Sequence, residues 1–217
     1  MIMKRKLFSL LVILLFCATG LFAQLGIKAG VNIASEMISF SQSDIKAGFN
    51  STNLTGYQIG LVYQVMPKKS ESGFGFEIGA LLTQKGSTFS DSTHIDNVIK
   101  QGYKELNYLE VPLNLRYHLS FGLVGVYGFG GVYGGYALSG KTVDESTNST
   151  QNTAYATQND HMDYGYNVGA GVEMFKKIQF GATLSQGLKN TSVAIVGLPT
   201  PTKATNRVYS VNLVYLF

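Results

Sequence analysis

Apolar and polar residues alternate along most of this chain, in segments of about ten residues or more. A period of two is the pattern of a β-strand whose two faces meet different surroundings. Eight segments show it, at about residues 25–34, 55–65, 73–86, 104–119, 123–138, 163–174, 178–188 and 207–217. The chain is therefore expected to be all-β.

The last segment shows the alternation most clearly. The following residues share one face, on which the chain ends: Tyr209, Val211, Leu213, Tyr215 and Phe217. Ser210, Asn212 and Val214 fall on the other face. An alternating strand that ends on Phe resembles the C-terminal assembly signal of bacterial outer-membrane β-barrels. This resemblance implies barrel-assembly machinery and periplasmic chaperones as partners during biogenesis.

Short and long connections alternate between these segments. The short ones are residues 66–72, 120–122 and 175–177, and the long ones are residues 35–54, 87–103, 139–162 and 189–206. Short periplasmic turns and long external loops are typical of an outer-membrane barrel, which must close because an open edge in hydrocarbon leaves backbone groups unpaired. We expect an eight-stranded antiparallel up-and-down transmembrane β-barrel with four long external loops.

The N-terminus predicts export. Lys4-Arg5-Lys6 precedes an apolar run at residues 7–16, and Ala23 precedes Gln24 at a suitable cleavage site. We expect residues 1–23 to be a signal peptide and residues 24–217 to be the barrel domain. The alternatives are a retained membrane helix, for which the run is short, and a lipoprotein modified at Cys17, which Phe16 disfavours.

Charge and cysteine content change once the signal peptide is set aside. The chain has 17 basic and 13 acidic residues, and three of the basic ones lie in the predicted signal peptide. The mature chain is nearly neutral, so nothing favours a nucleic-acid partner. The single cysteine is removed as well, which excludes thiolate metal sites and cysteine nucleophiles. We expect no catalytic, cofactor-binding or metal-binding residues.

Alternation alone does not show which face lines the interior. A secreted lipocalin-like barrel also has eight strands, but turns its apolar face inward. Here the polar face carries Gly, Asn, Gln and isolated charges, and aromatic residues gather at both ends of the segments. Two aromatic girdles are typical of a membrane barrel. We therefore expect the apolar face to meet lipid.

The glycine-rich fifth segment has an unclear phase. Residues 121–138 carry no charge, a length that also suits a membrane helix. Seven glycines in this stretch oppose a helix, because each costs about 1 kcal/mol relative to alanine. We predict a strand with a bulge near Gly130-Gly131, which would let both halves keep an apolar face.

Six charged residues fall on the expected inner face: Lys28, Glu77, Lys85, Glu110, Arg116 and Glu173. An eight-stranded barrel has room only for side chains or one small ligand, and charges in so narrow a lumen need partners. We expect a salt-bridged interior, with an ion path or gated pore as the alternative. Glu110 and Arg116 are too distant along one strand to pair, so each should pair with a neighbouring strand.

Several motifs resemble the PorT-like outer-membrane β-barrel family, which is abundant in Bacteroidetes. Tyr108-Leu-Glu-Val-Pro-Leu-Asn-Leu-Arg-Tyr117 is similar to its "YLEIPL" strand, and Gly169-Ala-Gly-Val-Glu173, Gln186-Gly-Leu-Lys-Asn190 and the signal cleavage point also fit. The resemblance implies an eight-stranded outer-membrane barrel. Most members have no defined activity, and one branch contributes to a secretion system that exports proteases and adhesins.

Two further motifs suggest chemistry. His118-Leu-Ser120 resembles the His-x-Ser motif of outer-membrane lipid A deacylases, but it lies at the periplasmic end and no matching acid follows. Residues 91–96 and 160–163 contain Asp and His that together suit a cation. We expect the Asp and His residues of both segments to be solvated loop residues.

The sequence therefore predicts a non-enzymatic integral protein of the bacterial outer membrane. Its partners are outer-membrane lipid and surface or secretion partners met by the four external loops. The alternatives are an accessory role in a PorT-type secretion system and narrow porin-like transport of ions or a small ligand.

Overall fold

The computed structural model describes residues 21–39, 49–67, 72–91, 101–145, 149–152, 161–190 and 203–217. These residues are nearly all in β-strands, as the alternation predicts. The strands are β1 (Leu21–Ser39), β2 (Phe49–Pro67), β3 (Gly73–Asp91), β4 (Gln101–Phe121), β5 (Val124–Asp144), β6 (Ser149–Asn152), β7 (Met162–Met174), β8 (Ile178–Gly187) and β9 (Lys203–Leu216).

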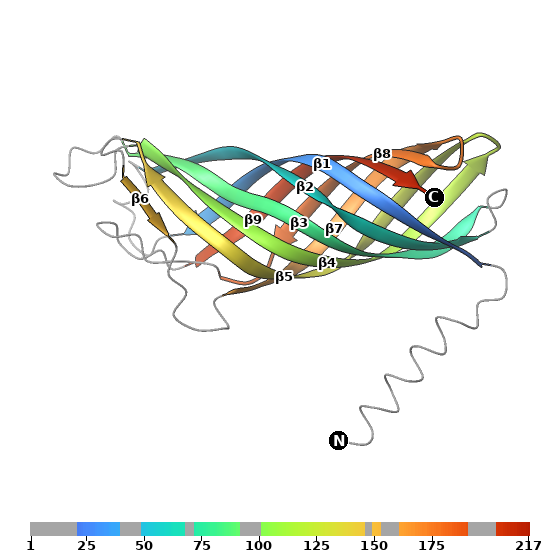
Figure 1. The fold of residues 1–217 in the computed structure, drawn as a ribbon, viewed down its shortest axis with the longest axis horizontal. Coiled ribbons are helices and arrows are strands. Elements are labelled where there is room, and N and C mark those ends of the chain that lie inside the picture. Colours follow the sequence, from blue (N-terminus) through green and yellow to red (C-terminus); the bar gives the residue numbers. More distant parts are fainter. Residues whose placement is uncertain are drawn as a thin grey trace, which may run out of the picture.

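The sheet closes on itself. Every pairing is antiparallel, in the order β4-β3-β2-β1-β9-β8-β7-β5, and β4 pairs with β5 to complete the ring. The short strand β6 pairs only with the end of β5, so among the described residues eight strands form the wall. Figure 1 shows the strands running obliquely around a long barrel. The predicted eight-stranded antiparallel barrel is confirmed.

The two ends of the barrel differ. We call "turn end" the end at which β4 meets β5 and β7 meets β8 through two and three residues. In the second turn Phe175 and Lys176 adopt positive φ angles of 55° and 60°, and Lys177 N–H donates to Met174 O at 3.2 Å. We call the other end "loop end"; it carries β6 (Figure 1). Short turns belong to the periplasmic side of an outer-membrane barrel.

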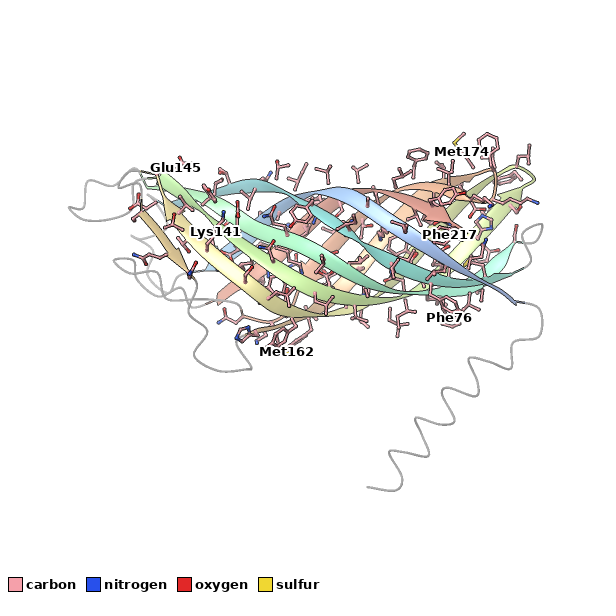
Figure 2. All side chains as sticks on the ribbon, in the orientation of Figure 1. Phe76, Lys141, Glu145, Met162, Met174 and Phe217 are labelled. Atoms are coloured by element: carbon pink, nitrogen blue, oxygen red, sulfur yellow. The ribbon has the colours of Figure 1, made fainter. Side chains whose placement is uncertain are left out.

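The apolar face points outward. Large apolar side chains on every wall strand are about half exposed, and the polar side chains opposite them are buried. On β4, for example, Leu113 is 50% exposed and Asn114 only 1%. Figure 2 shows side chains such as Phe76 and Met174 at the turn end, opposite Lys141 and Glu145 at the loop end. A lipocalin-like barrel has the reverse arrangement and is rejected.

The strands extend further toward the loop end than the alternation predicted. The predicted loops 35–54, 87–103, 139–162 and 189–206 begin or end within strands, which leave only residues 40–48, 92–100, 145–161 and 188–202 between consecutive wall strands. Polar residues are frequent on both faces of these extensions, so the alternation of apolar and polar residues is weak there. The loop boundaries predicted from the sequence were therefore wrong.

The fifth segment is a strand, and the predicted bulge at Gly130-Gly131 is wrong. Odd-numbered residues of β5 face inward from Gly125 to Ala137, and pairing with β4 is unbroken across the two glycines. The register instead shifts at Leu138, which lies between the partners of Asn107 and Tyr108. Within the described ranges, no helix has both the length and the apolarity needed to cross a membrane.

The first strand begins before the expected cleavage point. Residues Leu21, Phe22 and Ala23 pair with Pro67, Met66 and Val65 of β2. Most of the predicted signal peptide lies outside the described residues, and cleavage between Ala23 and Gln24 stays a prediction.

Candidate functional site in the barrel lumen

The inward side chains form a continuous polar core along the lumen. The structure places all six charged residues predicted for the inner face on that side, and five of them are at least nine-tenths buried: Lys28, Glu77, Lys85, Glu110 and Arg116. The sixth, Glu173, is also turned inward, with 13% of its side chain exposed. The contacts divide the core into three layers from the turn end to the loop end.

The first layer is centred on Arg116 of β4. Its guanidinium pairs with Glu77 of β3 and donates to Gln179 Oε1 of β8 at 3.2 Å. Gln64 of β2 donates to Glu77 at 2.7 Å and exchanges two hydrogen bonds of 3.0 Å with Gln179. Asn114 donates to the other oxygen of Glu77 at 3.2 Å. This layer joins four strands across the lumen.

Glu173 continues the first layer toward the turn end. It accepts a hydrogen bond of 2.8 Å from Gln179 Nε2, and its other oxygen lies 3.5 Å from His118 Nε2. His118 is thus a lumen residue beside a carboxylate. The structure brings it to Glu173. The backbone N–H of Ser120, the other residue of the His-x-Ser motif, donates to Ser72 Oγ at 3.0 Å.

Aromatic side chains of β5 cover this layer. The Arg116 guanidinium carbon lies 4.1 Å from the ring centre of Tyr127 and 5.6 Å from that of Phe129. The rings have room because β7 and β8 present glycine to them: a Cβ added to Gly171 or Gly181 would lie 2.5 Å from the Tyr127 hydroxyl. The sequence pattern predicted that Tyr127 would face lipid in the aromatic girdle at the periplasmic end, but its side chain lies inside the lumen.

The second layer is centred on Lys85 of β3. Its Nζ lies 3.0 Å from Glu110 Oε2 of β4 and 3.0 Å from Asp163 Oδ2 of β7. Tyr133 and Asn206 donate to the same Asp163 oxygen at 3.3 and 3.1 Å. The ring of Tyr133 lies 4.2 Å from Lys85 Nζ, so one ammonium group meets two carboxylates and an aromatic face.

The third layer lies nearest the loop end and contains one buried ion pair. Lys104 Nζ of β4 donates to Glu36 Oε1 of β1 at 2.8 Å, and Ser87 Oγ of β3 donates to Glu36 Oε2 at 3.4 Å. Both charged side chains are only 5% exposed. A buried ion pair therefore also lies in the lumen on the loop-end side of the second layer.

Lys28 differs from the other lumen cations. Among the described residues it has no ion pair or hydrogen bond, and its Nζ lies 6.0 Å from the ring centre of Phe129. The carboxylates of Glu77 and Glu110 attract it from the first and second layers. It therefore lies between the two layers without joining either.

Several members of the core were missed from the sequence. Asp163 was expected to be a solvated loop residue, but it lies on β7 and its side chain pairs with Lys85. The sequence pattern could have shown this, because Asp163 lies two residues before Gly165 and four before Asn167 and so falls on the same inward face of the strand. Gln64 and Gln179 gave no signal beyond their place on a polar face. His161, the other described member of that motif, donates from Nδ1 to Ala137 O at 2.8 Å.

The geometry favours a sealed structural core. Every layer joins side chains from different strands through charged hydrogen bonds. The interior of an eight-stranded barrel is wide enough for these side chains but leaves no room for ions to pass beside them. No group of three or more metal-ligating side chains occurs in the part of the chain that the structure describes. Residues 91–96 and Asp160 of the predicted cation motif lie outside the residues whose side chains are described.

The comparison with protein families agrees with this architecture. Residues 19–193 match the family model described as outer membrane protein beta-barrel domain. Similar solved structures include OprG from Pseudomonas aeruginosa (16% identity, 91% of this chain and 96% of that one, TM-score 0.49). Another is Ail of Yersinia pestis, with 12% identity over 90% of this chain and 99% of that one and a TM-score of 0.44. A third is the Neisserial surface protein NspA, with 9% identity over 90% of this chain and 99% of that one and a TM-score of 0.46. These similarities carry no functional information. No curated protein matches the sequence.

Proposed function

The chain belongs to the family of outer membrane protein beta-barrel domains, and from that premise we propose that it is a sealed, non-enzymatic membrane anchor. Its barrel holds a rigid platform outside the cell, and the connections at the loop end meet surface partners. The observation that carries the proposal is the lumen core, whose three layers of buried ion pairs block the axis of the barrel.

Anchoring is favoured over transport because, within the described strands, three lumen cations at successive levels are each paired with a carboxylate. A porin-like pore keeps a water-filled interior, which needs many more strands than eight. Here Arg116, Lys85 and Lys104 lie one above another, and each is bound to a carboxylate on a different strand. Opening the lumen would break these pairs and leave several charges buried without partners.

The length of the strands supports a platform. The 19 residues of β1, at a rise of about 3.3 Å and a tilt of about 40°, reach about 48 Å along the axis, roughly twice the apolar band of about 25 Å. Toward the loop end the outward face becomes polar: Asn107 donates to Ser139 at 3.2 Å, and Lys141 pairs with Glu105 at 2.9 Å. The barrel wall thus continues beyond the lipid.

A deletion strain tests the anchor role with two matched variants. In one, residues 92–100 are replaced by an Asn-Gly turn, which shortens the connection between the paired strands β3 and β4. In the other, the triple variant Lys85→Met, Glu110→Gln, Asp163→Asn changes the lumen without leaving a buried charge unpaired. If the proposal holds, the surface proteome changes caused by the deletion persist with the shortened connection and are reversed by the lumen variant. Reversal by the shortened connection, or channel current from the wild-type protein in a planar bilayer, contradicts it.

A role in a PorT-type secretion system is the second candidate, and the segment Tyr108–Tyr117 is the observation that favours it. That segment is the centre of β4, where Glu110, Asn114 and Arg116 contribute to the lumen core. Its resemblance to PorT-like barrels is thus carried by residues that build the barrel. Loss of protease and adhesin export in the deletion strain supports this role, and normal export dismisses it.

A further inference from the structure

An apolar groove lies on the outer wall of the barrel, over β8, β9 and β1. Its volume is about 310 Å³. The apolar side chains that line it are Val31, Ile33, Ala182, Leu184, Tyr209 and Val211. The groove is open to the side, because Val211 in its centre is 68% exposed.

The strand register explains the groove. Val211 pairs with Val31 of β1 on one side and with Ala182 of β8 on the other. In the next outward row, Tyr209 pairs with Ile33 and Leu184, whose side chains are larger. The small side chain of Ala182, next to a row of bulkier ones, leaves a hollow in the outer wall.

The third outward row, nearer the loop end, is polar. Arg207 pairs with Ser35 of β1 and Gln186 of β8. The Arg207 Nε–H donates to Gln186 Oε1 at 2.8 Å, and its terminal nitrogens have no partner among the described residues. By contrast, the outward Lys141 is paired with Glu105. A guanidinium with free donors therefore lies directly above the groove.

The depth of this arginine is set by the aromatic side chains around it. Tyr209, one row closer to the membrane centre, is outward and exposed, as are Tyr57 and Tyr164 on other strands. Outward tyrosines toward the ends of the strands of a membrane barrel mark the interface between hydrocarbon and headgroups. Arg207 is consequently at headgroup level on the external side, while the groove below it lies in the hydrocarbon.

We propose that this site binds one phosphorylated lipid of the outer leaflet, with an acyl chain in the groove and a lipid phosphate on Arg207. The groove faces hydrocarbon, so its occupant is a lipid chain. The planar guanidinium presents paired donors that match phosphate oxygens, and Gln186 holds it in place. This inference rests on the placement of the barrel in the membrane and is independent of the proposed anchor role.

Native mass spectrometry of the folded protein, released from detergent that contains bisphosphorylated lipid A, tests the site. The wild-type protein is expected to retain one lipid molecule, and Arg207→Gln to weaken retention about tenfold through loss of a charge-assisted contact. Arg207→Lys should keep most of it. Ala182→Phe should abolish retention by filling the groove.

Two matched variants control for general effects on the barrel. Lys141→Gln removes a paired outward cation, and Ala80→Phe adds a ring elsewhere on the lipid face; both should retain lipid as the wild type does. Heat-modifiable gel mobility verifies folding, and if Ala182→Phe does not fold, Arg207→Gln decides. Equal retention by all variants, equal retention of enzymatically dephosphorylated lipid A, or displacement by inorganic phosphate would overturn the proposal.

Discussion

Lys85 and Asp163 meet across the lumen, with 3.0 Å between Nζ and Oδ2, although they lie on strands that are not neighbours. Strands β3 and β7 are separated by β4 and β5 on one side and by four strands on the other. The ion pair therefore braces opposite walls, a role that pairing between adjacent strands does not perform.

The brace predicts a large penalty when its cation is removed. Lys85→Met leaves Glu110 and Asp163 buried without their partner and should lower the free energy of unfolding by about 3–5 kcal/mol. The triple variant Lys85→Met, Glu110→Gln, Asp163→Asn should recover most of that loss, because no uncompensated charge remains. Urea unfolding in lipid vesicles measures both, and a triple variant as unstable as the single one would refute the brace.

Arg116 should not tolerate lysine. Its guanidinium contacts Glu77, Gln179 and the ring of Tyr127 at once. Arg116→Lys keeps the charge but loses the fork and the stacking, at a cost of about 1.5–3 kcal/mol in the free energy of unfolding. The same unfolding assay applies, and an unchanged stability would show that charge alone matters at this position.

The glycines opposite the inner aromatic rings predict a sharp contrast. Gly181→Ala places a methyl group against the Tyr127 hydroxyl and should cost about 1–3 kcal/mol by overpacking. Gly134→Ala, an outward position on β5 with nothing within 4 Å of its added Cβ, is the matched control and should be neutral or stabilising. Equal losses in the two variants would mean that strand flexibility, not ring packing, requires the glycines.

A charged residue on the lipid-facing surface should lower the free energy of unfolding, most strongly near the middle of the apolar band. Leu113, outward and 50% exposed on β4, lies midway between the outward residues Leu109 and Tyr117. Leu113→Arg places a charge in the middle of the apolar band and should cost about 2–4 kcal/mol, while Leu113→Met should cost little. Unfolding in vesicles compares the two, and similar stabilities would indicate that this face does not meet hydrocarbon.

The alternation predicted the wall of the barrel because period two directly reports a strand with one lipid face and one lumen face. It placed Lys28, Glu77 and Arg116 on the polar face for the same reason. It did not identify their partners, since contacts such as Gln64 with Gln179 cross the lumen and depend on the curvature and stagger of the closed sheet. Closure is a property of the whole sheet and leaves no local signal.

The fifth segment shows the other limit of the pattern. Its inner face carries Tyr127, Phe129 and Tyr133, and its outer face carries several glycines, so hydrophobicity does not distinguish the two. The rings lie inside because the strands that face them present glycine, for instance Gly165, whose added Cβ would lie 2.7 Å from Tyr133. Phase in β5 is therefore set by residues on β7 and β8.

The most direct test is to measure which side chains of β4 face lipid. The sealed lumen and the lipid site both require that the apolar face of the barrel wall points outward. The chain has no tryptophan, so single substitutions to Trp at successive positions from Glu110 to Leu115 give clean probes in vesicles of brominated lipid. The account predicts strong quenching at the outward positions Val111, Leu113 and Leu115 and weak quenching at the positions between them. Quenching without this alternation, or with the opposite phase, would contradict it.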